Sequence, residues 1–425
     1  MGRRGDLCHV KAYIVPCTEI CLASYPVRHW FRLPNAPDVN GHNMDLSIPL
    51  ELRQIQDSVR AFIHRELAPL EQQVDLADDV DSATMRELRQ RAVSLGIYGF
   101  NLPSELGGGG IGPLGEVLVG EEIGRTTMPL AEVIGRLPQS LVHCDQEQAD
   151  WLLKPALRAE KTACIALTEP EAGSDLAGIR TRAVSVDGGW QISGSKQFIS
   201  NAETSDYILL LAVTDASASL RDRFTVFVID RTDPGLHFTH RFRKLGWHGY
   251  HISSFSLDDC RVGPDRVLGG VGNGFATMMA SVNRTRLYIA ARCVGAAQEL
   301  KKLAANYAVT RQTFGQTLGQ HEAIQFMLAD MDVELEAARL LVLAAAWKLD
   351  LGERDARIAT SRAKLYATEM AGRAADTALQ IFGGAGFMAD LPIERMYRDL
   401  RGYRIGEGSS EMQRIQIARH VLAQG

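Results

Sequence analysis

A glutamate between two glycines, Glu407 in the string GEGSSEMQ, is the residue whose type and setting best suit chemistry. Ser410 and Gln413 have the S-x-x-Q spacing of a capping box, which predicts that a final helix begins near Ser410. A glycine-flanked turn before a helix lets backbone N–H groups approach a ligand without interference from a Cβ atom. Such a turn can aim a carboxylate while amides hold a substrate oxygen. Taken by itself, the stretch is more often a solvated loop glutamate followed by an ordinary cap.

Four other strings offer ligand contacts. Residues 168–175 (TEPEAGSD) place hydrogen-bond donors in a turn that suits a polar or phosphorylated ligand. Residues 196–202 (KQFISNA) set an aromatic ring beside small polar groups, as a flat cofactor requires. Residues 311–316 (RQTFGQ) combine Arg and Thr for gripping a pyrophosphate, and residues 380–387 (QIFGGAGF) allow close backbone approach. Ordinary turns, a plain strand, a helix-terminal arginine and a C-cap remain alternatives.

Four histidines form two H-x-x-H pairs that resemble a metal site: His237 with His240, and His248 with His251. They fall in a β-rich part of the sequence. Positions three apart along a strand point to opposite faces, so the members of each pair do not converge simply. We therefore predict no metal site.

Composition bounds the possible functions. The chain has 425 residues, 46% of them hydrophobic and 23% charged, which is ordinary for a globular protein of two or three domains. A net charge of −5 argues against a nucleic-acid-binding surface, and no apolar run has the length of a membrane span. Seven scattered cysteines without a C-x-x-C indicate a reducing compartment. We expect the cytoplasm, or the mitochondrial matrix in a eukaryote.

The hydrophobic pattern changes twice along the chain, which predicts an α+β fold. Residues 1–43 form no convincing element and are predicted to be a disordered extension or a misassigned start. Residues 44–160 have helical periodicity and are predicted to form an N-terminal helical domain. Residues 161–272 contain short β-rich runs without intervening helices, which predict a middle antiparallel β domain. Residues 273–425 predict long helices in a C-terminal four-helix bundle.

Individual elements follow from the same patterns. A stripe of apolar residues after Pro49 predicts a first helix, and residues 187–189 (DGG) predict a hairpin turn. The glycine run at 107–110 lacks the Lys and Ser/Thr of a P-loop, so we interpret it as a flexible helix–helix connection. The other predicted helices cover residues 83–95, 115–124, 146–157, 283–309, 316–351 and 354–381, with a last one running to the C-terminus.

Together these strings resemble the acyl-CoA dehydrogenase family of FAD-dependent flavoproteins, over about residues 46–422. The resemblance also rests on KLGW (residues 244–247), NRTR (283–286) and HEAIQFMLADM (321–331). It implies FAD as cofactor, an acyl-CoA thioester as substrate, an electron-transferring flavoprotein as acceptor, and a homotetramer. Nucleic acid and integral membrane segments are not expected.

The family's functional positions carry over as follows. Glu407 occupies the position of the catalytic base in most family members. The resemblance implies that flavin N5 accepts the hydride and that the product is a trans-2-enoyl-CoA. A minority of members place the base at the position of Thr285, which cannot serve as one. The resemblance implies cofactor contacts from Thr168, Phe198, Ser200, Arg311, Thr313, Phe314, His321, Gln380, Gly384, Ser409 and Glu411. It implies substrate contacts from Ser174, Asn283, Arg286 and Gly408.

Three departures from the family pattern concern the substrate. Gly406 stands where Tyr is frequent, which widens the expected pocket for branched, cyclic or sterol-like acyl groups. Asn283 replaces a common Asp near CoA, and Glu322 replaces a common Gln near FAD. The alternatives are an oxidase, reductase or monooxygenase on the same fold, or a non-catalytic acyl-CoA-binding subunit. Retention of Glu407 speaks against the monooxygenase branch and, with the FAD-contact positions, against the non-catalytic subunit.

Overall fold

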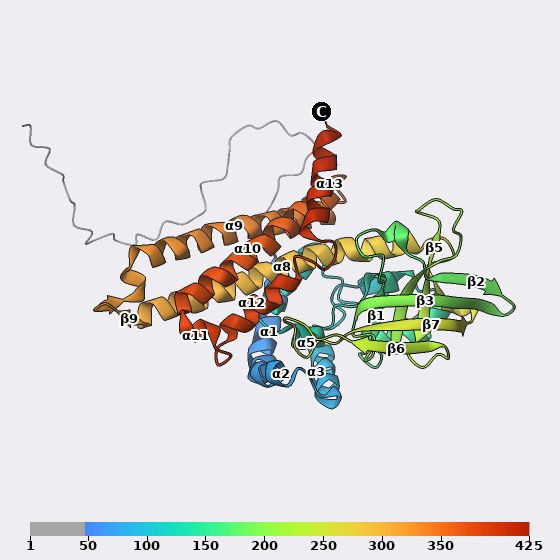
Figure 1. Cartoon of the computed structure of the whole chain (residues 1–425), viewed down its shortest axis with the longest axis horizontal. Coiled ribbons are helices and arrows are strands. Elements are labelled where there is room, and N and C mark those ends of the chain that lie inside the picture. Colours follow the sequence, from blue (N-terminus) through green and yellow to red (C-terminus); the bar gives the residue numbers. More distant parts are fainter. Residues whose placement is uncertain (1–46, 425) are drawn as a thin grey trace, which may run out of the picture. The chain divides into compact units, whose positions relative to one another are not determined.

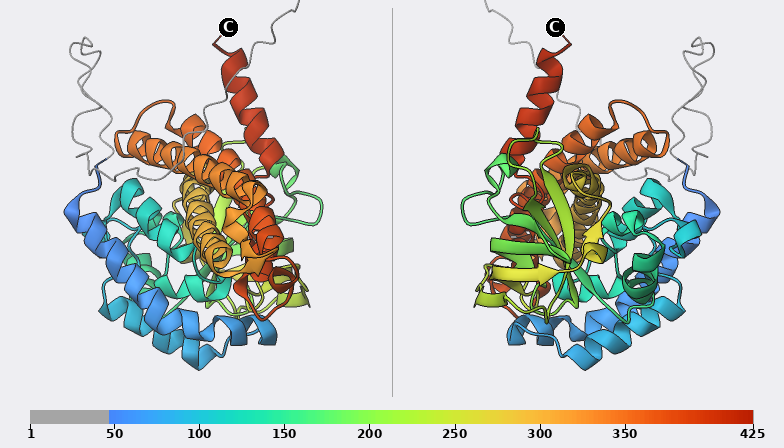
Figure 2. Two further views of the ribbon diagram at one scale, coloured as in Figure 1. Left: turned by 90° about the vertical axis from the view of Figure 1, so that its left-hand side faces the viewer. Right: turned by 90° about the vertical axis from the view of Figure 1, so that its right-hand side faces the viewer.

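A computed structural model describes residues 47–424, which follow the predicted order of helices, sheet and helices (Figure 1). The predicted extension, residues 1–43, lies outside the described residues. The N-terminal helices, blue to cyan in Figure 2, pack beside and below the long C-terminal helices and run across their direction. Within the described part of the chain, no helix combines the length and apolarity that a membrane span requires.

The N-terminal part is helical, as predicted. Its α-helices are α1 (Leu50–Phe62), α2 (Glu71–Ala77), α3 (Ser82–Ser94), α4 (Gly112–Ile123), α5 (Met128–Ala131), α6 (Gln146–Gln148) and α7 (Lys154–Leu157). The predicted first helix is α1, which buries Val59 and Phe62. Helix α3 begins after Asp81, whose carboxylate accepts a hydrogen bond from the Thr84 N–H at 2.9 Å.

The glycine run joins α3 to α4, as predicted. A Cβ atom at Gly108 would lie 2.3 Å from the carbonyl oxygen of Leu102, and one at Gly109 would lie 2.8 Å from the Cα of Phe100. Close packing of the loop on itself, rather than flexibility, therefore accounts for these glycines.

The middle part is an eight-stranded sheet in the order β6-β7-β3-β2-β4-β5-β8, with β1 beside β4. The strands are β1 (Ala163–Ala166), β2 (Arg182–Val186), β3 (Gly189–Ser200), β4 (Tyr207–Val213), β5 (Phe224–Asp230), β6 (Leu236–Arg241), β7 (Ile252–Val262) and β8 (Val267–Leu268). The predicted hairpin at 187–189 joins β2 and β3. The sheet is antiparallel except where β4 pairs with β1 and β2. Parallel pairing is possible there because the strands are separated by connections long enough to cross over.

The C-terminal part is a bundle of long helices. They are α8 (Gly274–Thr310), α9 (Glu322–Asp350), α10 (Ala356–Phe382), α11 (Gly384–Phe387), α12 (Pro392–Gly402) and α13 (Ser410–Leu422). Helix α10 presents Ala363, Ala367, Ala371 and Ala378 as fully buried small residues. This spacing lets α8 and α9 pack closely against one side of α10.

Two of the predicted helix starts were wrong. Helix α8 begins at Gly274, nine residues before the predicted position. Helix α9 begins at Glu322 rather than 316, because residues 312–317 form a small hairpin, β9 (Gln312–Thr313) with β10 (Gln316–Thr317). A capping box between Thr317 and Gln320 then starts a single 3₁₀ turn before α9.

Helices α4 and α8 cross with their backbones in contact. A Cβ atom at Gly124 would lie 2.0 Å from the carbonyl oxygen of Arg292, and one at Gly295 would lie 1.7 Å from that of Glu121. Only glycine allows so close an approach. The crossing joins the N-terminal helices to the bundle.

Candidate active site

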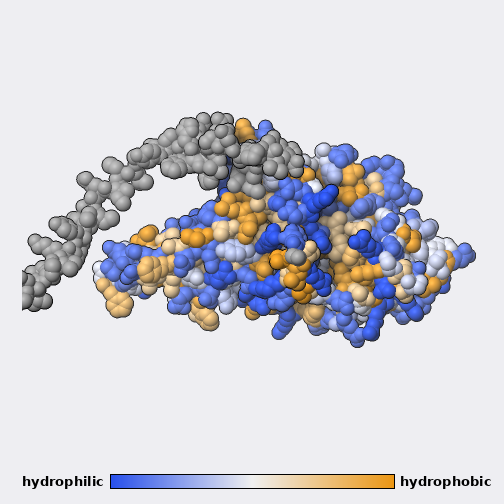
Figure 3. Space-filling model, turned by 90° about the horizontal axis from the view of Figure 1, so that it is seen from above, coloured by the Kyte–Doolittle hydropathy of each residue, from blue (hydrophilic) through white to orange (hydrophobic). Residues whose placement is uncertain are grey.

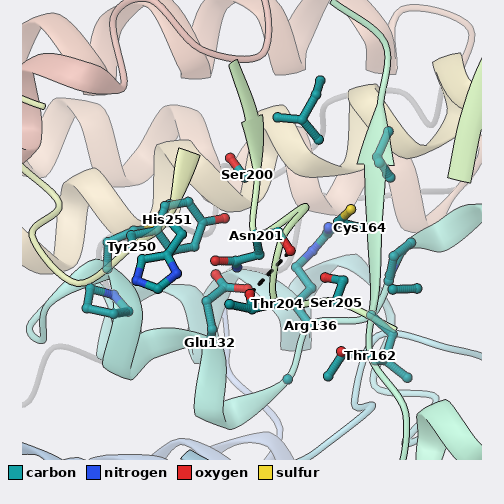
Figure 4. Close-up of a pocket in the computed structure, with 18 of the residues that line it drawn as sticks. Glu132, Arg136, Thr162, Cys164, Ser200, Asn201, Thr204, Ser205, Tyr250 and His251 are labelled. Atoms are coloured by element: carbon teal, nitrogen blue, oxygen red, sulfur yellow. Dashed lines mark hydrogen bonds between the residues drawn. The ribbon is translucent and has the colours of Figure 1, made fainter. Parts of the chain in front are cut away.

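A cavity of about 770 Å³ lies where the N-terminal helices, the β domain, α8 and the loop before α13 meet. That volume is in the range of cofactor and substrate sites. Figure 4 shows Glu132 and Arg136, from the segment after α5, reaching into it, with Ser200, Asn201 and Thr204 of the β domain nearby. Of the predicted functional positions, the walls include Thr168, Phe198, Ser200 and Glu407. Thr285 and Gly406 also line the cavity.

The Glu407 turn is held by side chains from three helices. Glu407 has a φ of 55° and Gly408 a φ of 86°, so both are in the left-handed region. Arg286 on α8 donates from Nε to the Glu407 carbonyl at 2.9 Å. Lys364 on α10 and Gln413 on α13 each donate to the Gly408 carbonyl at 2.9 Å. A left-handed glutamate is strained, and these donors stabilise it.

Helix α13 begins at Ser410, as predicted, but the predicted capping box between Ser410 and Gln413 was wrong. The N-cap of α13 is Ser409, whose hydroxyl accepts a hydrogen bond from the Met412 N–H. Ser410 instead donates to a carboxylate oxygen of Glu369 at 2.7 Å. The Gln413 side chain is therefore free to hold the Glu407 turn.

Glu407 is open to the cavity, yet protein surrounds it on most sides. Burial disfavours the charged form and raises the pKa of Glu407. The positive charges of Arg286, Arg136 and Lys364 oppose that rise. A carboxyl group with a raised pKa is a stronger base once it has lost its proton.

The β-domain wall owes its shape to a break in the β3–β7 ladder. The pairing shifts register between Lys196 and Ile199, which is a β-bulge. At this bulge Phe198 has a φ of 58° and a side chain that is 56% exposed. Its ring rests on Phe242, with the centroids 4.8 Å apart. The bulge thus presents an aromatic ring and the Ser200 hydroxyl to the same cavity.

A buried ion pair holds this wall to the neighbouring turn. Lys196 donates from Nζ to Glu169 Oε1 at 2.9 Å and to the Leu167 carbonyl at 2.9 Å. The Glu169 carboxylate also accepts hydrogen bonds from the backbone N–H groups of Arg180 and Thr181. Burial raises the pKa of Glu169, but Lys196 and these donors outweigh it and hold that pKa below its ordinary value. Burial lowers the pKa of Lys196 to about 8, so both groups are charged at neutral pH.

The predicted substrate-binding residues fall into two groups. Arg286 contacts the Glu407 carbonyl and also donates to Asn283 Oδ1 at 3.2 Å, so Asn283, Arg286 and Gly408 all adjoin the Glu407 turn. Ser174 is exposed on the turn after β1.

Other predicted cofactor-binding residues lie outside the cavity. Thr313 Oγ1 and His321 Nε2 are 3.0 Å apart at the hairpin between α8 and α9, where Phe314 is 99% exposed. Arg311 is exposed at the end of α8. Gln380 and Gly384 lie at the end of α10 and the start of α11. This chain alone therefore does not bring these six residues to the Glu407 site. Ser409 and Glu411 directly follow the Glu407 turn, at the start of α13, but they do not line the cavity.

The second histidine pair contacts two aspartates. His248 Nδ1 lies 3.0 Å from Asp75, and His251 Nε2 lies 3.0 Å from Asp79. Within residues 47–424, no group of three or more His, Cys, Asp or Glu side chains is placed to hold a metal ion.

Three family models match consecutive parts of the chain. They describe the N-terminal (residues 49–160), middle (164–260) and C-terminal (272–422) domains of acyl-CoA dehydrogenases. The chain belongs to the acyl-CoA dehydrogenase family. It is therefore an oxidoreductase that acts on a CH–CH bond.

Individual relatives extend this match over most of the chain. The chain is 34% identical over 406 residues to (R)-benzylsuccinyl-CoA dehydrogenase of Thauera aromatica, covering 90% of this chain and 98% of that one. It is 36% identical over 374 residues to 3-(aryl)acrylate reductase of Clostridium sporogenes, covering 87% of this chain and 97% of that one.

Solved structures share this fold over most of the chain. Butyryl-CoA dehydrogenase from Megasphaera elsdenii superposes with a TM-score of 0.83 at 29% identity, covering 89% of this chain and all of that one. PigA in its FAD complex has a TM-score of 0.82 at 26% identity, covering 90% and 100%.

FAD is the cofactor of this acyl-CoA dehydrogenase family member. The cavity fits it, because Phe198 offers an aromatic face and Thr168 and Ser200 offer hydroxyl groups on one wall. Tyr250 also lines this cavity.

Sequence reasoning missed several charged residues of the site. Arg136, Glu132 and Arg292 line the cavity, and Lys364 is fully buried behind the Glu407 turn. A usable signal existed for Arg292, because it is a lone charge within a stretch of small and apolar helical residues. Lys364 carried no such signal, because Arg362 stands two residues before it. Arg136 follows a glycine in a loop and carried no such signal.

Proposed function

We propose that this chain removes two hydrogens from the α and β carbons of an acyl-CoA thioester and releases a trans-2-enoyl-CoA. The observation that supports this most directly is Glu407, a carboxylate with a raised pKa on a clamped turn that faces the cavity. Family membership supports the same reaction. The relatives' names cover both a dehydrogenase and a reductase, so the direction of catalysis is part of the proposal.

In the proposed reaction Glu407 removes the α-proton as a general base. FAD, when bound, supplies the acceptor for the β-hydrogen. The backbone N–H of Glu407 donates to the thioester carbonyl and stabilises developing enolate charge. Arg286 orients this peptide through the Glu407 carbonyl. Ser174, Asn283 and Arg286 are proposed to hold the CoA portion, and an electron-transferring flavoprotein is the proposed electron acceptor.

Anaerobic mixing of the FAD-loaded protein with a panel of acyl-CoAs tests this function. The panel includes short, long, branched, aromatic and steroid side-chain thioesters, because Gly406 leaves room beside the base. Bleaching of the flavin absorbance by at least one thioester is expected. Oxygen consumption without an added acceptor would instead identify an oxidase. A colourless protein that cannot be reconstituted with FAD would point to a non-catalytic binding subunit.

Lys364 is proposed as a positioning residue. Burial lowers the pKa of Lys364 to about 8, and its ammonium holds the Gly408 carbonyl from behind the turn. Lys364→Met is expected to lower the rate of flavin reduction at saturating acyl-CoA about tenfold or more, because small misplacements of a base are costly. FAD content and the KM for acyl-CoA should change little. Lys348→Met, which removes an ion pair at the end of α9, is the matched control.

An exposed apolar stripe on α9 supports the proposed homotetramer. Phe326, Val333 and Leu340 are spaced seven residues apart and are 60%, 69% and 50% exposed. Figure 3 shows apolar patches, in orange, on the face of the molecule seen from above Figure 1. An apolar stripe of this length on one helix is typical of a helix–helix interface between subunits.

Phe326→Asp with Leu340→Asp is therefore expected to reduce the assembly to dimers or monomers, measured by light scattering after size exclusion. FAD should be lost at the same time, if Arg311 and Phe314 reach a neighbouring subunit's cofactor. Leu76→Asp is the control, because Leu76 is 70% exposed on α2, away from this stripe. A wild-type protein that is monomeric and FAD-loaded would contradict the proposed tetramer.

A further inference from the structure

Arg136 brings a buried positive charge into the cavity near the base. Its side chain is 11% exposed, and its guanidinium lies over the ring of Tyr288, 5.0 Å from the ring centroid. Nε donates to Glu116 at 3.2 Å, and Nη1 donates to Thr285 Oγ1 at 3.1 Å. These two contacts fix the plane of the guanidinium.

Most of the hydrogen-bonding capacity of Arg136 is unused. A guanidinium has five N–H donors, and the two contacts use one on Nε and one on Nη1. Nη2 is buried and has no partner among the described residues. A buried donor without a partner costs stability, so it calls for a ligand that the protein itself does not supply.

No nearby carboxylate of the described residues neutralises the Arg136 charge alone and throughout the reaction. Glu116 is shared, because it also pairs with Arg284. The negative charge of Glu407 offsets part of the free energy that burial of the Arg136 cation costs. That charge is lost when Glu407 accepts a proton. Glu132 lines the same cavity among Arg89, Arg136 and Arg292, and Nε of Arg292 also has no partner in the described part of the chain. A bound carboxylate would balance this group of arginines throughout the reaction.

We infer that the acyl group taken by this chain carries a second carboxylate, which Arg136 binds through its free Nη donors. This inference rests on the proposed function, because it places the reacting carbons beside Glu407. Arg136 and Glu407 line the same cavity, and the charge of Arg136 acts on the Glu407 carboxyl group. The second carboxylate is therefore placed only a few carbons from the carbon that loses its proton. The substrate class is short dicarboxylic acyl-CoA thioesters.

The test compares each carboxylated thioester with its own methyl ester, which has the same chain without the charge. The pairs are succinyl-, methylsuccinyl-, glutaryl- and adipyl-CoA with their monomethyl esters. The measurement is the anaerobic second-order rate of flavin reduction. In the wild-type protein at least one pair is expected to favour the carboxylate by about 10²-fold, the upper range for a charge-assisted hydrogen bond.

Two variants separate a binding role from a structural one. Arg136→Gln is expected to reduce the carboxylate-to-ester rate ratio to near one, and Arg136→Lys to retain part of it. Arg284→Gln is the matched control, because Arg284 shares Glu116 but does not line the cavity, so the ratio should persist. The change in flavin absorbance on binding each thioester to reduction-incompetent Glu407→Gln should show the same preference.

The possible outcomes are distinct. Equal rates for acid and ester in every wild-type pair would overturn the inference while leaving the dehydrogenase function intact. A ratio that survives Arg136→Gln would assign the preference to another residue and also overturn it. If Arg136→Gln does not fold, the wild-type ratio and the Arg136→Lys variant still decide. If no acyl-CoA reduces or perturbs the flavin, the proposed function itself has failed.

Discussion

Glu407→Gln is expected to keep FAD and to bind acyl-CoA but to lose flavin reduction by at least ~10²-fold, the low end for a general base. The amide has nearly the shape of the carboxyl group, and the turn is held through backbone carbonyls that the substitution leaves in place. The measurement is stopped-flow bleaching of the flavin under anaerobic conditions. Glu147→Gln, an exposed residue of α6, controls for the loss of one negative charge.

The pH dependence adds a second readout of the same residue. The pKa of Glu407 is raised by burial, so the base is protonated and inactive at low pH, and activity rises as pH passes through that raised pKa. Because Arg136 opposes the rise, Arg136→Gln should move this acid limb to higher pH. Near-normal bleaching in Glu407→Gln would remove Glu407 from the mechanism.

Lys196→Met is expected to destabilise the β domain by about 3–5 kcal/mol, because it leaves Glu169 buried without its partner. The ion pair ties the turn that carries Thr168 to the bulge that carries Phe198 and Ser200. FAD affinity should therefore fall together with stability. Chemical denaturation followed by fluorescence, together with flavin content after purification, measures both effects.

The double variant Glu169→Gln with Lys196→Met separates pairing from packing. Removing both charges is far less costly than removing one, so the double variant should regain much of the lost stability. Lys161→Met is the control, because its ion pair with Asp206 is partly exposed and contributes little. Additive losses in the double variant would show that the pair contributes through packing instead of charge.

Local patterns in the sequence predicted what depends on nearby residues. Helical periodicity predicted α1, α3 and α10, turn residues predicted the β2–β3 hairpin, and the glycines beside Glu407 predicted the turn before α13. The capping-box prediction was wrong because Ser409 and Ser410 are adjacent serines, and either could cap the helix. Only the contact from Ser410 to Glu369, 41 residues away, decides between them. The predicted start of α9 was wrong because the capping box at Thr317 begins a 3₁₀ turn, and the α-helix starts only after that turn.

The polar residues behind and opposite Glu407, the proposed base, could not be found in this way. Lys364 reaches Gly408 across 44 residues, and Arg136 reaches Thr285 across 149. No local pattern encodes such distances. Each is fixed by the packing of whole helices.

The crossing of α4 and α8 has a consequence for the order of folding. Gly124 and Gly295 are far apart in the sequence, and contacts of that kind form slowly because a long loop must close first. Arg136 follows α4 closely in sequence, and Thr285 lies on α8, so they can meet only after the two helices have crossed. The N-terminal helices can form early by themselves. The cavity, however, lacks the wall that α8 supplies until α4 and α8 have crossed. FAD capture by the refolding chain is therefore expected among the last events, after most of the helical signal has returned.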